Sequence, residues 1–152
     1  MVLYPEKLKV SKSMGRLLRK EAFHVTFNQN FSQVIKACSE VDRKDQDGTW
    51  ITEGMQQAYL NLHKMGYAHS VEVWQEGQLA GGLYGVYLRE EGVFCGESMF
   101  SKLSNASKYG FIKWVQKLQK EGVQLIDCQV HTAHMESLGA EEIPREEFLK
   151  YL

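Results

Sequence analysis

Between residues 68 and 100 the hydrophobic pattern of this chain repeats every two residues, which is the period of a strand with one buried face. Turn residues at positions 76–77 and 90–92 divide the stretch into three runs: residues 70–74, 79–88 and 93–100. Strands joined by such short turns pair antiparallel. The stretch therefore predicts a three-stranded meander, and other segments must cover its faces.

Segments with a helical period flank this meander. Side chains that can cap helices precede four of them, which end near residues 22, 41, 66 and 121: Ser11 or Ser13, Asn30 in a capping box with Gln33, Thr52, and Ser104. The apolar faces expected to pack inward include Phe31, Val34, Ile35 and Cys38, then Met55, Ala58, Tyr59 and Leu62, and finally Phe111, Trp114, Val115 and Leu118. Short apolar runs predict strands at residues 8–10, 23–27 and 124–129, and the polar run 42–48 predicts a loop.

The order of these elements narrows the fold class. Helices, then a three-stranded meander, then a long helix that crosses back to another strand, is the order found in acyltransferases of the GNAT class. By this analogy we expect an α+β, GNAT-like acyltransferase fold with a mostly antiparallel mixed sheet flanked by helices. In that class the acyl donor enters where the last meander strand and the strand after the long helix part.

The size and composition of the chain exclude several classes of protein. A length of 152 residues suits one domain, so we expect residues 1–152 to form a single domain. No apolar run approaches the roughly 18 residues of a membrane span, so we expect no membrane partner and a cytoplasmic location. Three widely spaced cysteines favour reduced thiols over a disulfide framework.

The net charge of −1 gives no reason by itself to expect a nucleic-acid partner. The first 20 residues nevertheless hold six basic residues against one acidic residue: Lys7, Lys9, Lys12, Arg16, Arg19 and Lys20 against Glu6. Such a patch can meet phosphates, or it can be the solvated face of a helix.

Two acidic residues lie in otherwise apolar strands. Leu125, Asp127 and Gln129 share one face of the strand 124–129, because side chains alternate along a strand. A carboxylate there costs several kcal/mol unless it finds a donor or a cation, or serves chemistry. Glu97 is expected to share a strand face with Val93, Cys95 and Met99. The two carboxylates are either an active-site pair or structural acceptors of hydrogen bonds.

Other patterns carry weaker signals. Cys128, His131 and His134 recur every three residues, but a fourth ligand is not apparent and the strand ends among them, so we expect no metal and no cofactor. Cys128 as a nucleophile is disfavoured because its side chain points away from Asp127. Mid-strand glycines at positions 81, 82 and 85 indicate either a close approach by another group or a bulge.

Five segments of the chain carry a family resemblance: WITEGMQQAYLNLHKMGYAHSVEVW (50–74), LAGGLYGV (79–86), GESMFSKLSNASK (96–108), LIDCQ (125–129) and HMESLGAEEIPR (134–145). They closely resemble the bacterial leucyl/phenylalanyl-tRNA protein transferases over nearly the whole chain. The resemblance implies transfer of leucine or phenylalanine, with methionine as a further donor, from aminoacyl-tRNA to the N-terminal Lys or Arg of proteins. That transfer marks the acceptor proteins for degradation through the N-degron route.

The same resemblance implies roles for individual residues. Asp127 and Gln129 match the family positions that hold the acceptor amine and assist its deprotonation, and Glu97 matches a position at the same pocket. The pocket for the transferred side chain maps onto four apolar residues: Leu83, Trp114, Leu118 and Ile126. Trp50 matches a residue that contacts the terminal adenosine at the 3′ end of the tRNA.

The chain departs from the family pattern at its N-terminus. Two other functions also compete with the one that the resemblance implies. Family members begin with a smaller N-terminal module that supplies part of the tRNA-end site, and this chain starts where that module should end. Either the gene is short, its start lies at an internal Met, or the chain is a fragment. An acyl-CoA-dependent N-acyltransferase would need a Gly-rich turn where this chain has SKLSNASK. A non-catalytic module that binds peptides or tRNA ends is the third hypothesis.

Overall fold

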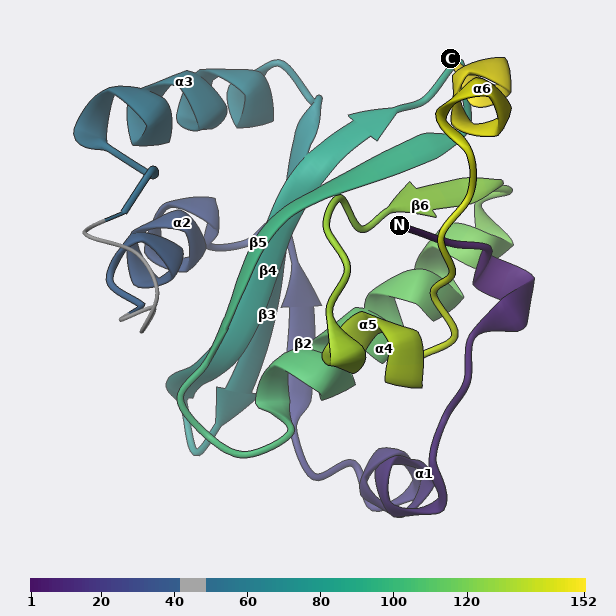
Figure 1. Cartoon of the computed structure of the whole chain (residues 1–152). Helices are drawn as coiled ribbons and strands as arrows, with labels where there is room; N and C mark the ends of the chain where they lie inside the picture. The colour runs from purple at the N-terminus through teal and green to yellow at the C-terminus, as the bar shows by residue number, and fades with distance from the viewer. Residues whose placement is uncertain (42–48) are drawn as a thin grey trace.

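The predicted meander lies at the centre of the sheet (Figure 1). Its strands are β3 (Ala68–Gln75), β4 (Gln78–Leu88) and β5 (Val93–Ser101), and each pairs antiparallel with the next. The structure is a computed structural model that describes residues 1–41 and 49–152, and the predicted loop at residues 42–48 lies outside the described residues. Within the described ranges the sheet has six strands in the order β1-β6-β5-β4-β3-β2.

Three shorter strands extend the sheet on both sides of the meander: β1 (Val2–Leu3), β2 (His24–Phe27) and β6 (Leu125–Asp127). β2 pairs antiparallel with β3, β6 runs parallel to β5, and β1 pairs antiparallel with β6. The predicted strand at residues 8–10 is wrong. The strand forms at Val2 and Leu3 instead, because these two apolar side chains are buried against β6 while Val10 stays exposed.

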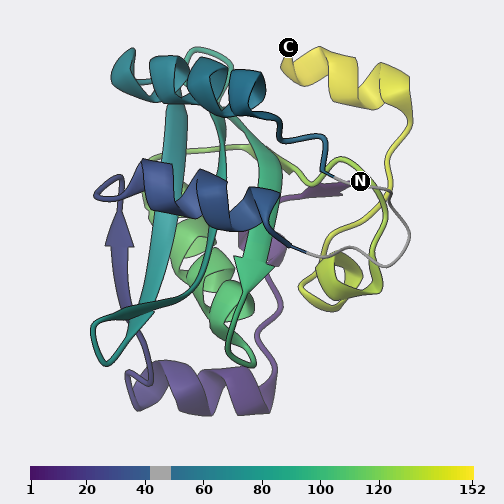
Figure 2. The ribbon, with the colours of Figure 1, turned by 90° about the vertical axis from the view of Figure 1, so that its left-hand side faces the viewer.

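Helices cover both faces of the sheet (Figure 2). On one side lie α1 (Lys12–Arg19), α4 (Ala106–Lys120) and α5 (Ala133–Ser137), and on the other lie α2 (Phe31–Ser39) and α3 (Glu53–Lys64). Near the end of the chain lies α6 (Arg145–Phe148), which packs near β1, β5 and β6. Two short 3-10 helices span Pro5–Lys7 and Leu149–Tyr151. The prediction of an α+β fold with a mixed sheet flanked by helices is confirmed. No helix in residues 1–41 and 49–152 is long and apolar enough to cross a bilayer.

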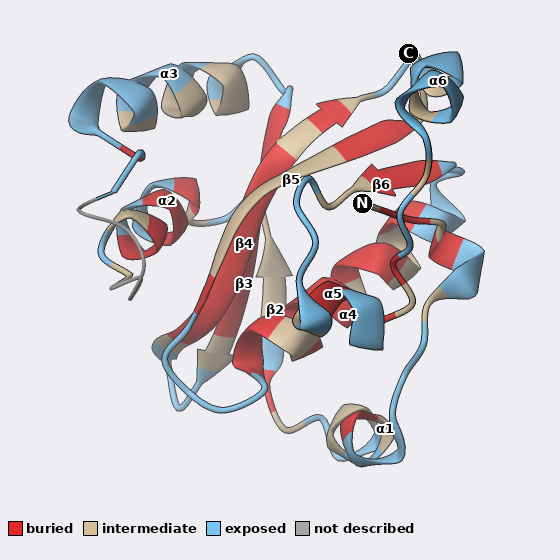
Figure 3. Cartoon of the chain, viewed as in Figure 1, coloured by how far each residue is buried: buried red, intermediate tan, exposed pale blue. Residues whose placement is uncertain are grey.

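The helix faces follow the predicted pattern in α2 and α4 but not in α3. Every predicted inward residue of α2 and α4 is buried. In α3, Met55 and Ala58 are exposed, and the helix shows only exposed and intermediate side chains (Figure 3). This difference arises because α3 packs against α2 and β3 at the side of the sheet, and its half-buried Tyr59 and Leu62 make the contact.

Two of the predicted helix caps are present and two are not. Ser11 and Thr52 accept hydrogen bonds from backbone N–H groups in the first turns of α1 and α3. Asn30 makes no side-chain cap, so the predicted capping box is wrong. Ser104 does not cap α4, since the N–H of Ser107 donates to Ser101 Oγ at 3.1 Å instead.

The start of α2 is held by a buried acid. Glu72 on β3 is fully buried, and its carboxylate accepts hydrogen bonds from Thr26 Oγ1 (2.6 Å), Ser70 Oγ (2.6 Å) and the N–H of Asn30 (3.2 Å). The N–H of Gln29 lies 3.4 Å from the same carboxylate. Because these donors satisfy the charge, Glu72 joins β2, β3 and α2, and no ion pair forms with it among residues 1–41 and 49–152.

Glu97 is the extra residue of a bulge between β4 and β5. Gly85 pairs with Gly96 and Tyr84 pairs with Ser98, so Glu97 has no opposite residue on β4. A side chain at Gly85 would collide with the carbonyl oxygen of Cys95. Both interpretations of the mid-strand glycines therefore hold at this position: a close approach and a bulge.

The bulge exchanges the two faces of β5. Before the bulge, Phe94 packs in the core beneath α4. Cys95 packs on the opposite side, against the cluster of Val2, Val93 and Leu125 that Phe148 of α6 also joins. After it, Met99 packs beneath α4 and Phe100 packs with α2. The prediction that residues 93, 95, 97 and 99 share one face is therefore wrong, because one additional residue shifts the alternation.

Candidate active site

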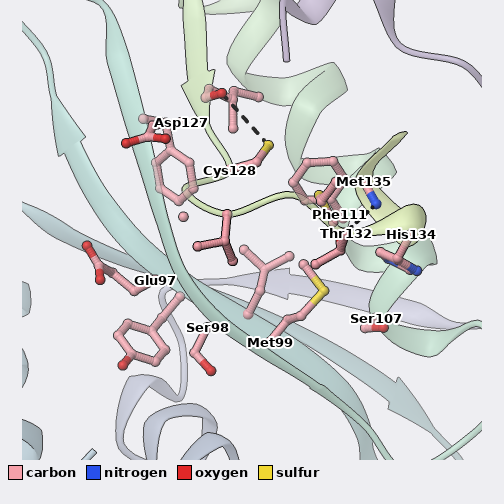
Figure 4. Close-up of a pocket in the computed structure, with 16 residues that line it drawn as sticks. Glu97, Ser98, Met99, Ser107, Phe111, Asp127, Cys128, Thr132, His134 and Met135 are labelled. Carbon is pink, nitrogen blue, oxygen red and sulfur yellow. Dashed lines mark hydrogen bonds between the residues drawn. The ribbon is translucent and has the colours of Figure 1, made fainter. Parts of the chain in front are cut away.

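A cavity of about 340 Å³ lies among β5, the end of β6, α4 and α5 (Figure 4). Apolar side chains form most of its wall: Leu83, Phe94, Met99, Phe111, Ile126 and Met135. Asp127 and Glu97 lie toward one side of it, whereas Ser107 and His134 lie toward the other (Figure 4). The cavity can thus enclose an apolar group that has polar atoms beside it.

The cavity exists because β5 and β6 part. Their parallel pairing runs from Val93–Leu125 to Cys95–Asp127 and stops there. β5 continues beyond the bulge to Ser101, while the chain after Asp127 turns away at Gln129, whose φ of +60° is in the left-handed region. Asparagine and glycine adopt that conformation more readily than glutamine, so this backbone is held by its surroundings.

The three polar residues predicted to act together do come together. Asp127 Oδ1 accepts a hydrogen bond from the N–H of Gln129 at 2.8 Å, and Gln129 Nε2 donates to Glu97 Oε2 at 3.3 Å. Asp127 and Glu97 are half-buried and Gln129 is exposed. Gln129 therefore bridges the two carboxylates across the gap between β5 and β6.

The route to this cluster differs from simple strand alternation. The strand ends at Asp127, so Gln129 reaches Glu97 through its left-handed backbone and not through a shared strand face. Glu97 is in turn placed by the bulge. Asp127 also borders a second hollow of about 370 Å³, on the side of Gln129 and Arg145.

Of the four residues predicted to form the side-chain pocket, two border the cavity and two do not. Leu83 and Ile126 line the cavity. Trp114 and Leu118 do not line it and pack in the core instead. The Trp114 ring packs edge-on against Phe94, at 5.3 Å between ring centroids, and so lies behind a wall residue. Trp50 lies outside the cavity, before α3, with 39% of its surface exposed.

The sequence analysis did not assign several residues of this cavity to the site, among them Met99, Phe111, His134 and Met135. Met99 stands two positions after Glu97 in the GESMFS segment, while Phe111 comes from α4 and His134 and Met135 come from α5. The helical repeat of apolar residues predicted that Phe111 is buried. Such a repeat does not show which buried residues border a cavity. Burial, with the charge of Lys108 as a smaller cause, lowers the pKa of His134, so its imidazole is neutral at pH 7.

The thiols beside the site are not activated. Burial, and then the negative charge of Asp127, raises the pKa of Cys128 to about 12. Burial, followed by the charges of Asp127 and Glu97, raises the pKa of Cys95 to about 11. Both groups are therefore protonated thiols at neutral pH, which argues against Cys128 as a nucleophile.

We expect Cys95 and Cys128 to resist alkylation by iodoacetamide in the native protein at pH 7.5, because only the thiolate reacts and each raised pKa keeps its population small. Peptide mass spectrometry after timed labelling would measure this, with the unfolded protein in urea as the control in which both cysteines react. Rapid native labelling of Cys128 would contradict the account of its surroundings.

The site combines an apolar cavity with two carboxylates and an amide, groups that suit the binding of an amine beside an apolar group. The chain belongs to the leucyl/phenylalanyl-tRNA protein transferase family, whose family model matches residues 2–152. This is a family of aminoacyltransferases.

Individual relatives support this membership. The chain is 64% identical over 152 residues to the leucyl/phenylalanyl-tRNA–protein transferase of Christiangramia forsetii and covers 72% of that protein. It is 56% identical over 151 residues to the enzyme of that name from Pseudomonas fluorescens (strain Pf0-1) and covers 66% of it. For the Flavobacterium johnsoniae relative the identity is 55% and the coverage 71%.

A solved structure shares the fold at low identity. It is a conserved protein of unknown function from Bacteroides thetaiotaomicron, with a TM-score of 0.57 and 10% identity. The match covers 82% of this chain and 48% of the other. At this identity the likeness concerns the fold alone.

Proposed function

We propose that this protein transfers leucine or phenylalanine, and also methionine, from aminoacyl-tRNA to the α-amine of acceptor proteins that begin with Lys or Arg. The proposal includes a single domain over residues 1–152 with a GNAT-like fold, a cytoplasmic location and a role in tagging proteins for the N-degron route. The observation that carries it is the apolar cavity bordered by Asp127, Gln129 and Glu97 in a chain of this family.

The chemistry is attack of the acceptor amine nitrogen on the ester carbonyl carbon of the aminoacyl-tRNA. A C–N bond forms, the C–O bond to the ribose breaks, and the ribose hydroxyl leaves with a proton. A free α-amine has a pKa of about 7.7–8.0, so part of it is already a nucleophile at neutral pH. The protein must then orient both substrates, accept a proton from the amine and stabilise the oxyanion.

The site offers groups for these tasks. The carboxylate of Asp127 can accept a proton from the amine, and the backbone N–H of Gln129 orients that carboxylate through its hydrogen bond to Oδ1. The donor side chain would occupy the cavity beside Leu83 and Ile126. The acceptor would approach from the second hollow, which Asp127 also borders, so that the two substrates meet at this carboxylate.

The tRNA would meet residues outside the cavity. The partly exposed ring of Trp50 is available for stacking on the terminal adenosine. The basic residues of α1 are exposed and face solvent, so they are available for phosphates of the acceptor arm.

Reversing the charge of Lys12, Arg16 and Arg19 to Glu is expected to weaken aminoacyl-tRNA binding and to flatten its dependence on salt. Each lost phosphate contact reduces the slope of log K against log [salt] by about 0.7–0.9. Filter binding between about 50 and 200 mM salt would measure the slope. An unchanged slope would remove α1 from the tRNA interface and leave it as a solvated helix.

The proposed activity is tested by incubating the protein with Phe-tRNA and peptides that differ only in an N-terminal Lys, Arg or Glu. Phenylalanyl peptide should form with the first two acceptors. Binding of tRNA without product would favour the non-catalytic module. Calorimetric binding of acetyl-CoA, together with acetylation of the peptide, would favour the acyl-CoA-dependent N-acyltransferase. The absence of a Gly-rich turn between β5 and α4 argues against that alternative.

A further inference from the structure

The second hollow, of about 370 Å³, is bordered by residues from the end of β6 and from α6. Asp127 and Gln129 come from the first of these segments, and Arg145 and Phe148 come from the second. Ile143, just before α6, borders the hollow as well. Because Asp127 also lines the apolar cavity, its carboxylate is shared by the two spaces. A molecule in the hollow would therefore meet a donor in the cavity at this carboxylate.

Backbone pairing ties α6 to the strand that carries Asp127. Val2 pairs with Asp127 on β6, and its N–H donates to the carbonyl oxygen of Glu141 at 2.8 Å. The N–H of Glu141 donates back to the carbonyl oxygen of Val2 at 2.8 Å. Arg145 and Phe148 follow three residues apart in α6, so their side chains lie on the same face of the helix. The fold thus brings both side chains to the hollow.

The side chains from the α6 region have two kinds of chemistry. Ile143 and Phe148 are half-buried and pack against the buried apolar residues of β1, β5 and β6. Arg145 is exposed, and no ion pair within residues 1–41 and 49–152 includes it. The hollow can therefore take an apolar side chain and has a positive charge beside it.

An acceptor whose α-amine meets Asp127 would direct its first two side chains differently. Consecutive side chains of an extended peptide point to opposite sides, with a rise of about 3.4 Å per residue. The basic first side chain is attracted by the carboxylates, and Glu97 lines the cavity. The second side chain would then point away from Glu97, toward Ile143 and Phe148.

We propose that this hollow is the subsite for the second residue of the acceptor. Ile143 and Phe148 hold an apolar side chain there, and Arg145 lowers the affinity for a positively charged one. This inference rests on the proposed function, since it describes the path of the acceptor at the same site. It makes the protein selective beyond the N-terminal Lys or Arg, because acceptors with Leu in second place bind more tightly than those with Gly.

Three peptides test this selectivity: Lys-Leu-Gly, Lys-Gly-Leu and Lys-Gly-Gly, each followed by the same sequence. For transfer from Phe-tRNA, the KM of the first peptide should be about tenfold lower than that of the third, because burial of a Leu side chain is worth at least this factor. The second peptide should resemble the third, since a side chain in third place points away from the hollow again. No gain from Leu in second place, or an equal gain in third place, would overturn the assignment.

Phe148→Ala tests the apolar part of the subsite. It should reduce the KM ratio of the Gly and Leu peptides from about tenfold to about twofold, because Ile143 alone then contacts the side chain. Leu149→Ala is the matched control, since this neighbouring residue is 49% exposed and does not border the hollow. Each KM ratio compares two peptides on one preparation, so a smaller folded fraction leaves it unchanged. The wild-type ratio in Phe148→Ala would overturn the role of Phe148.

Arg145→Glu tests the charge beside the hollow, with peptides that begin Lys-Glu and Lys-Lys. The substitution should shift the ratio of their KM values by about tenfold in favour of Lys-Lys, because the reversed charge now attracts the second Lys and repels Glu. Lys150→Glu, a reversal at an exposed position after α6, is the control and should keep the wild-type ratio. The wild-type ratio in Arg145→Glu would overturn the role of Arg145.

Peptide binding separates this subsite from the proposed transfer. Fluorescence anisotropy of the Lys-Leu-Gly and Lys-Gly-Gly peptides, labelled at their C-termini, gives Kd without any tRNA. The Leu peptide should bind about tenfold more tightly to the wild-type protein. That preference without transfer would support the subsite and count against the proposed function. Transfer to both peptides with equal KM and equal Kd would overturn the subsite and leave the proposed function in place.

Discussion

Replacing Asp127 by asparagine is expected to slow transfer to a Lys-initiated peptide by about 10²- to 10⁴-fold, the usual contribution of a positioned general base. Asparagine keeps the size of the side chain and an oxygen that can accept from the N–H of Gln129, so the turn after β6 is retained. It lacks the basic oxygen that takes a proton from the amine. Single-turnover kinetics with saturating Phe-tRNA would measure the rate of the chemical step.

The matched control for this variant is Glu142→Gln, a carboxyl-to-amide change at an exposed position near the end of the chain. It should transfer at the wild-type rate. Binding of Phe-tRNA to Asp127→Asn should also be retained, because the proposed donor contacts lie in the cavity and at Trp50. Wild-type rates in Asp127→Asn would remove this carboxylate from the mechanism, and Glu97 would then be the remaining acid of the cavity.

Replacing Glu72 by leucine is expected to lower the free energy of unfolding by about 3 kcal/mol or more, since each buried donor left without a partner costs about 1–3 kcal/mol. The substitution removes the acceptor shared by Thr26, Ser70 and the N–H of Asn30. The loss therefore reaches β2, β3 and the start of α2 together. Urea denaturation followed by tryptophan fluorescence would measure the change.

Glu90→Gln in the exposed turn between β4 and β5 provides the comparison for Glu72. Its free energy of unfolding should stay within about 0.5 kcal/mol of wild type. A similarly small effect of Glu72→Leu would show that the three donors find water or other partners. The account of Glu72 as the fixed link among three elements would then be wrong.

The periodic parts of the fold could be predicted from sequence because each depends on local pattern. In α2 and α4 the apolar residues repeat with the period of the buried helix face, and turn residues divide the meander into its strands, although β3 and β4 are buried on both faces. Features that depend on distant partners were not predictable in this way. β1 forms where Val2 and Leu3 meet β6, and the cap of α2 comes from Glu72, more than 40 residues along the chain.

The candidate site shows the same division. Asp127, Gln129 and Glu97 were predicted to meet, and they do, although the bulge at Glu97 and the left-handed Gln129 bring them together. Neither feature has a period-two signature, so alternation wrongly placed Met99 on the same face as Cys95. Among the described residues the fully buried acid is likewise Glu72 and not Asp127, since Thr26 and Asn30, which are distant in sequence, provide its donors together with Ser70.

The most direct test of the central claim is single-turnover transfer from labelled Phe-tRNA to a Lys-initiated peptide, with the product identified by mass spectrometry. The wild-type protein should attach one phenylalanine to the α-amine of the peptide and none to the lysine side chain, and Asp127→Asn should lose most of this product while still binding Phe-tRNA. Formation of the same product at the same rate by both proteins would contradict the assignment of Asp127. A wild-type protein that binds Phe-tRNA and yields no phenylalanyl peptide would contradict transfer itself.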